Sequence, residues 1–127
     1  MNNRPYIDHA FAGIKPFTES LEQAGITYTI LDDSPRSLLG EIPGILNPED
    51  DTVKTGKCVK NGNDMFFAEF GIRITPGYRS HIVFIYDHVP ERDELLVTVN
   101  DIEAIIMQRL DNVDLNDVFE QGKKLKQ

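Results

Sequence analysis

The pair Asn61-Gly62 constrains the fold more than any other feature, because it separates two runs of alternating apolar and polar residues. Asn-Gly favours a two-residue type I′ turn, whose twist matches that of antiparallel strands. In such a turn Lys60 faces Asn63, and counting outward places Lys54 opposite Glu69. We therefore predict a long β-hairpin around residues 61–62.

The hairpin is expected to belong to a meander of about four strands from Thr52 to Val99. The Pro76-Gly77 pair predicts a type II turn after the second strand. The run from Ser80 to Val89 is apolar on both faces, which is typical of a central strand. The strand from Thr52 to Lys60 carries lysines and is expected at the edge of the sheet, and Leu95–Val99 is expected to close the meander.

Helical periodicity marks the N-terminal region. Apolar residues recur every three or four positions from Asp8 to Ala24, although Pro16 interrupts a continuous helix. We predict a short first turn and then a main helix from Pro16 to Ala24, ended by Gly25. The β-branched and aromatic run Ile26–Leu31 predicts a strand.

The remaining segments complete an α+β pattern. Ser37–Ile42 is expected as a short strand and Pro43–Asp51 as a surface loop, because the latter holds two prolines, a glycine and three acids. Asn100 is expected to cap a long helix and Asp114 a shorter one. The tail 122–127 is basic and expected to fray.

We therefore expect a single domain over residues 1–127: an antiparallel β-meander of four to six strands, with an N-terminal helix and C-terminal helices packed on one face. The residues predicted to form its core are Phe66, Phe70, Ile72, Val83, Phe84, Ile85, Leu21, Ile102, Ile106 and Leu110.

Composition bounds the class of protein. The 127 residues are 40% hydrophobic and 27% charged, which is typical of a globular chain. No apolar run approaches the roughly 20 residues that span a bilayer, and the N-terminus lacks the pattern of a signal peptide, so a cytoplasmic location is expected. The single Cys58 excludes an internal disulfide.

The net charge is −8, from 21 acidic and 13 basic residues. This charge disfavours binding to nucleic-acid phosphates. It is consistent with solubility alone or with attraction to a basic protein partner, and both interpretations stay open.

Candidate catalytic groups are few. The histidines His9, His81 and His88 lack metal-ligand spacing, so neither a metal nor a cofactor is predicted. Glu69 and Asp87 form the one carboxylate pair worth testing for a metal-dependent nuclease, but no lysine follows Glu69 at the required step. A cross-strand pair of Glu69 with a lysine is the favoured interpretation.

We expect a non-catalytic acidic protein-binding module, such as an inhibitor, an immunity or anti-defence type protein, or a secretion chaperone. Its partner-binding residues are predicted to be Met65, Phe67 and Glu69 on the sheet, together with Glu49, Asp50 and Asp51 in the acidic loop. The alternative is that segment 26–42 or loop 43–51 buries Met65 and Phe67.

Two other functions stay open. The first is a structural subunit of a homo-oligomeric or phage-particle assembly, and the second is a small metal-dependent hydrolase. No membrane partner is expected, and a homo-oligomer is compatible with the sequence.

Overall fold

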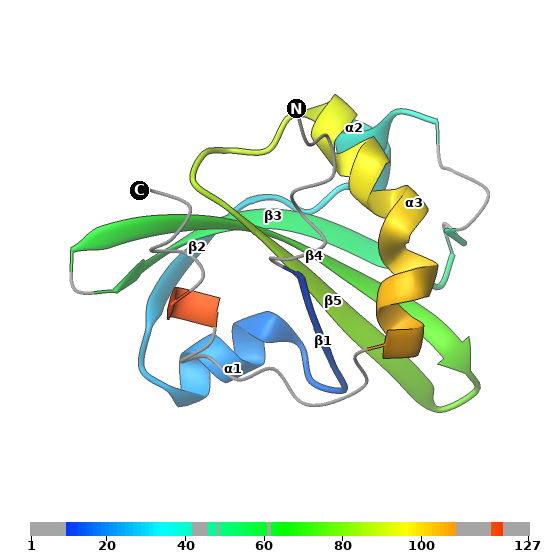
Figure 1. Ribbon diagram of the computed structural model, residues 1–127, viewed down its shortest axis with the longest axis horizontal. Helices are drawn as coiled ribbons and strands as arrows, with labels where there is room; N and C mark the ends of the chain where they lie inside the picture. The colour runs from blue at the N-terminus through cyan, green and yellow to red at the C-terminus, as the bar shows by residue number, and fades with distance from the viewer. Residues whose placement is uncertain (1–9, 42–45, 48, 61, 109–117, 121–127) are drawn as a thin grey trace.

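The computed structural model describes residues 10–41, 46–47, 49–60, 62–108 and 118–120, and a twisted antiparallel sheet forms its centre (Figure 1). Five strands lie in the order β1-β5-β4-β3-β2. The strands are β1 Ala10–Gly13, β2 Thr27–Asp32, β3 Thr52–Lys60, β4 Asn63–Thr75 and β5 Tyr78–Tyr86. The helices are α1 Phe17–Gln23, α2 Pro35–Leu39 and α3 Arg92–Gln108.

The predicted hairpin register is confirmed. Lys60 pairs with Asn63 and Lys54 with Glu69 along β3 and β4. Gly62 has a φ of +79°, a conformation that glycine adopts without the steric cost of a side chain. The next hairpin is also present: Thr75 pairs with Tyr78, and Gly77 between them has a φ of +83°.

The order of the strands corrects one expectation and agrees with another, since β5 lies inside the sheet as predicted. β3 is an interior strand, paired with β4 on one side and β2 on the other, so its lysines do not mark an edge. β4 occupies the centre of the sheet, and β5 lies between β4 and β1. Among the described strands, β1 and β2 form the edges of the sheet.

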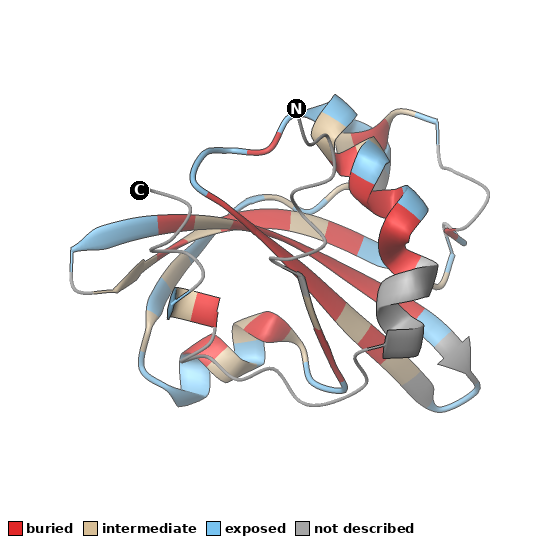
Figure 2. Cartoon of the chain, in the orientation of Figure 1, coloured by how far each residue is buried: buried red, intermediate tan, exposed pale blue. Residues whose placement is uncertain are grey.

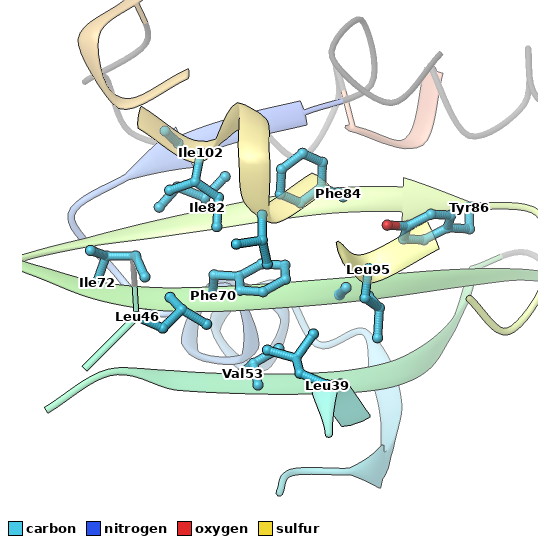
Figure 3. Packing of buried hydrophobic residues seen from close by; sticks show 13 residues of the cluster. Leu39, Leu46, Val53, Phe70, Ile72, Ile82, Phe84, Tyr86, Leu95 and Ile102 are labelled. Carbon is cyan, nitrogen blue, oxygen red and sulfur yellow. The ribbon is translucent and has the colours of Figure 1, made fainter. Parts of the chain in front are cut away.

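Helices cover both faces of the sheet, which corrects the expectation that they share one face (Figure 2). The two-residue period of β4 and β5 turns large apolar side chains to both sides, and each side needs a cover. α2 and α3 pack on the face of Phe70 and Phe84, as Figure 3 shows for Leu39, Leu95 and Ile102. α1 packs on the opposite face. The α+β class with an antiparallel meander is confirmed.

The segment Leu95–Val99, expected as a strand, lies inside α3. Leu95, Val99 and Ile102 are buried at helical spacing, which a period of two cannot explain. The helix begins after Glu91, whose backbone N–H donates to the Glu94 carboxylate at 2.9 Å. Asn100 is therefore an exposed residue within the helix and not its cap.

The N-terminal half holds one confirmation and two corrections. α1 follows Pro16 closely as predicted, and Gly25 beyond its end has a φ of +72°. Residues 10–13, expected as a helical turn, form β1, while Asp8 lies outside the described residues. Residues 35–39 form α2 where the strand Ser37–Ile42 was expected, because the Ser34 hydroxyl caps the backbone N–H of Ser37.

Most of the predicted core is confirmed. Phe70, Ile72, Val83, Phe84, Ile85, Leu21 and Ile102 are buried, and Phe66 is half-buried. The side chain of Ile106 and all of Leu110 lie outside the described residues, as do Asp114 and the tail 122–127. Residues 118–120 are helical, and Val118 is buried against the α1 face.

Candidate functional site

The apolar half of the predicted partner surface is not exposed. Met65 is 4% exposed and Phe67 is 0% exposed, so neither side chain can contact a partner in this structure. The Phe17 ring of α1 packs edge-to-face on the Phe67 ring, with centroids 5.0 Å apart. The expected patch is therefore wrong. The alternative of burial is correct: α1 covers the two side chains, and Ile26 and Tyr28 of segment 26–42 pack against the same cluster.

Glu69 is a buried carboxylate, 2% exposed, on the same face of the sheet. Its Oε2 accepts a hydrogen bond from the backbone N–H of Phe17 at 3.1 Å and lies 3.1 Å from His81 Nδ1. Its Oε1 lies 4.0 Å from Lys54 Nζ and has no hydrogen-bond partner. The predicted pair of Lys54 with Glu69 is thus present as a long ion pair.

The position of Glu69 explains its burial. The Phe17 N–H lies at the start of α1, where a backbone donor has no acceptor within the helix, and Pro16 before it has no side chain that could cap the helix. Glu69 supplies the acceptor from β4 and so fixes α1 on the sheet. We assign Glu69 a structural role in joining the helix to the strand.

The structure does not bring Glu69 and Asp87 together. Glu69 pairs with Val83, and Asp87 follows four residues later, about 13 Å along the strand. Asp87 instead lies 2.6 Å from His88 Nδ1. Within the described residues no three His, Cys, Asp or Glu side chains gather in a way that could hold a metal ion.

The acidic loop divides into structural and exposed residues. Asp51 is buried and accepts hydrogen bonds from the backbone N–H groups of Asn47 at 2.8 Å and Arg73 at 3.0 Å. Asp50 is more exposed, with its Oδ1 3.5 Å from Arg73 Nη2, and Glu49 is exposed. Of these three acids, only Glu49 and Asp50 therefore present charge at the surface. Reversing the charge of Asp51 is expected to destabilise the fold.

His88 lies between two carboxylates at the start of α3. Its Nδ1 is 2.6 Å from Asp87, and its Nε2 is 2.8 Å from Glu94. The hydrogen bond to Asp87, with a further contribution from Glu94, raises the pKa of His88 above its ordinary value. The imidazole is exposed, and this arrangement fastens the loop after β5 to the first turn of α3.

Cys58 is fully buried under α1, opposite Met65. Burial raises the pKa of its thiol to about 11. The thiol is therefore protonated near neutral pH and unsuited to act as a nucleophile.

The outer edge of β2 is the feature that suits interaction best. Among the described residues, β2 pairs with β3 alone. Its stretch Thr27–Leu31 has no charge, proline or glycine, and Ile30 and Leu31 are 36% and 47% exposed. Edge strands usually carry charged residues or proline, or are short. These features oppose the pairing of their free N–H and C=O groups with a further strand.

Two contacts hold β2 in place. The Tyr28 hydroxyl donates to the Glu22 carboxylate of α1 at 2.7 Å, and this hydrogen bond raises the pKa of Tyr28. On the other side, a Cβ at Gly56 of β3 would lie 2.5 Å from the Phe67 ring and 2.8 Å from the Thr29 carbonyl oxygen. Gly56 is required for this close approach, which seats β2 against β3.

The sequence predicts β2 as a strand but not as an edge. An uncharged β-branched run is typical of an interior strand, whereas lysines are typical of an edge. Here the lysine-bearing β3 lies inside the sheet and the uncharged β2 at its edge, and no signal within Thr27–Leu31 itself identifies its position.

No protein-family model, curated protein or solved structure matches this chain. No helix in the described part of the chain is long and apolar enough to cross a membrane. The class that the fold defines is therefore a small α+β protein with an antiparallel sheet covered on both faces.

Proposed function

We propose that this protein acts by binding a protein partner, without catalysis, and that the partner adds a strand along the outer edge of β2. The observation that supports the proposal is the combination of an edge open among the described residues with an uncharged stretch bearing exposed Ile30 and Leu31. Strand addition is a recurring mode of protein recognition, in which main-chain hydrogen bonds give affinity and alternate side chains give specificity.

β2 offers both components of such recognition. Alternate backbone groups of a strand point away from its one neighbour and are available to a second strand. Ile30 and Leu31 are both exposed on the strand, so an added strand can bury apolar surface at this edge.

The acidic character of the chain supports a basic partner. Glu22 and Asp33 are exposed next to β2, and Glu49 and Asp50 add charge elsewhere on the surface. Charges of this kind raise the rate of association with a positively charged protein more than they raise affinity. An inhibitor, an immunity or anti-defence type protein, and a secretion chaperone all act by binding another protein.

A structural subunit of a homo-oligomeric or phage-particle assembly is the second candidate. The same observation favours it, because an open edge strand can pair with the strand of a neighbouring subunit. In this case the partner is another copy of the chain and not a different protein.

The variant Ile30→Lys tests strand addition. The full chain carrying this change is used to capture proteins from the cells that produce it, alongside the wild type and Ile14→Lys. Ile14 is 52% exposed outside β2, so its variant adds the same charge at an unrelated apolar position.

We expect a protein retained by the wild type and by Ile14→Lys to be lost from Ile30→Lys, because a lysine at the edge opposes pairing. Retention by all three chains would contradict the proposal. Replacing Glu49 and Asp50 together by lysine should slow association with a basic partner at low salt, and this effect should shrink as salt rises.

A further inference from the structure

We infer that β2 pairs antiparallel with β2 of a second copy of this chain, on a two-fold axis that passes beside Thr29. This inference rests on the second candidate function, the homo-oligomeric subunit, since it names another copy of the chain as the occupant of the β2 edge. It joins the two sheets into one continuous sheet through an isologous contact, in which each strand presents the same residues to the other.

The side chains of β2 are complementary to themselves in this arrangement. With Thr29 opposite Thr29 of the second copy, Tyr28 of each strand lies opposite Ile30 of the other. Aromatic residues opposite β-branched ones, and threonine opposite threonine, are stabilising cross-strand pairs. The irregularity between Ile30 and Asp32 confines regular pairing to this central stretch.

The distribution of charge selects the antiparallel direction. The acidic residues Asp32 and Asp33 follow the uncharged stretch at one end only. An antiparallel pair places the acidic ends of the two strands far apart, each beside the uncharged start of the other. A parallel pair would bring the acidic ends together, and opposed like charges destabilise a sheet.

The same geometry predicts the response to salt. A two-fold axis perpendicular to the sheet places α1 of both copies on one face, and Glu22 lies near that axis because it binds Tyr28 at 2.7 Å. Each chain also carries a net charge of −8. Salt screens this repulsion, so association is expected to strengthen as the ionic strength rises.

Thr29→Cys tests the register directly. Cysteines on the axis have Cα atoms within the roughly 4.4–6.8 Å that a disulfide needs, because opposed residues of antiparallel strands lie about 4.5–5.5 Å apart. Thr27→Cys is the matched control: it lies on the same exposed strand, but its two copies would be separated by about 13 Å along the strands. Cys58 does not compete, since its thiol is buried.

Mild oxidation of concentrated protein should convert Thr29→Cys to a covalent dimer and leave Thr27→Cys monomeric on a non-reducing gel. Light scattering of the wild type should show a fraction of dimer that rises with protein concentration and with salt. The few paired residues bury a small area, so we expect the association to be weak. Thr29→Lys, which opposes two charges on the axis, should weaken the dimer at least about tenfold, a change of about 1.4 kcal/mol.

A wild type that stays monomeric at every concentration and salt would overturn the dimer, as would equal cross-linking of the two cysteine variants. If such a monomer still captures a different protein that Ile30→Lys loses, the function in strand addition stands without the dimer. If Ile30→Lys also captures the same proteins as the wild type, both proposals fail.

Discussion

The two edge strands of the sheet differ in how far their unpaired backbone groups are protected from a further strand. β1 has four residues within the described part of the chain. Its Ala12 is buried in the same cluster as Ile102 of the long helix α3, and Gly13 is buried too. β2 has six residues, and apart from the half-buried Tyr28 and Asp32 all of them are exposed. A short, covered edge offers little backbone to a further strand, whereas a longer uncharged edge offers a template for one.

This difference indicates where interaction energy is available. The apolar surface of β1 is already buried in the folded chain, because the strand pairs with β5 and packs in the cluster under α3. Its burial therefore stabilises the fold. The apolar surface of Ile30 and Leu31 stays exposed in the folded chain, and its burial by a partner is what we propose. The predictions below test this contrast, from the largest expected effect to the smallest.

Phe84→Ala should lower the free energy of unfolding by about 3–5 kcal/mol, because it leaves a cavity in the core next to β1. The Phe84 side chain is fully buried, and its ring packs edge-to-face on Phe70 with centroids 5.7 Å apart. Denaturant unfolding measures the effect. Ile30→Ala on the open edge is the comparison and should change stability by no more than about 0.5 kcal/mol. Similar losses in the two variants would contradict the contrast between the edges.

Gly56→Ala should lower the free energy of unfolding by about 1–3 kcal/mol, since the new methyl group overlaps the Phe67 ring and the Thr29 carbonyl oxygen. The strain arises where β2 contacts β3, so the rate of amide exchange should increase more in β2 than in β1. Lys57→Ala at the next position is the control, because Lys57 is only half-buried. An unchanged melting temperature for Gly56→Ala would show that β2 can move away without cost.

The third prediction concerns pH and the end of the molecule near α3. Bonds to Asp87 and Glu94 raise the pKa of His88 above 6.5, so its protonated form is favoured in the folded state. The stabilisation is complete below the unfolded pKa and is lost as pH rises through the folded pKa. The effect should be small and weakened by salt, because the group is exposed.

Urea unfolding at a series of pH values from below 6.5 upward measures this dependence, with His88→Gln as the control. The wild type should lose stability with rising pH relative to the variant. A wild type that instead gains stability relative to His88→Gln over that range would contradict the assignment.

Local signals in the sequence predict the parts of this fold that depend on neighbouring residues. Asn61-Gly62 predicts the register of β3 with β4 as far as the pair of Lys54 and Glu69, because a two-residue turn determines which residues are opposite each other. The main helix after Pro16 is predicted for the same reason, since proline and Gly25 mark its ends.

The predictions are wrong where a tertiary contact determines the secondary structure or the burial of a segment. Leu95–Val99 is rich in β-branched residues, yet the bond from the Glu91 N–H to Glu94 and packing over β5 make it helical. Met65 and Phe67 look exposed only if all helices share one face, and α1 covers the other. The candidate site was missed because β2 has no residue that marks an edge.

Amide hydrogen exchange, followed residue by residue at low and at high protein concentration, tests the central claim that the β2 edge accepts β2 of a second copy. Alternate amides of β2 should become more protected as concentration rises, because those that point away from β3 gain partners in the second copy. The amides of β1 should not change. Protection in β2 that is independent of concentration, or that rises equally in β1, would contradict the account.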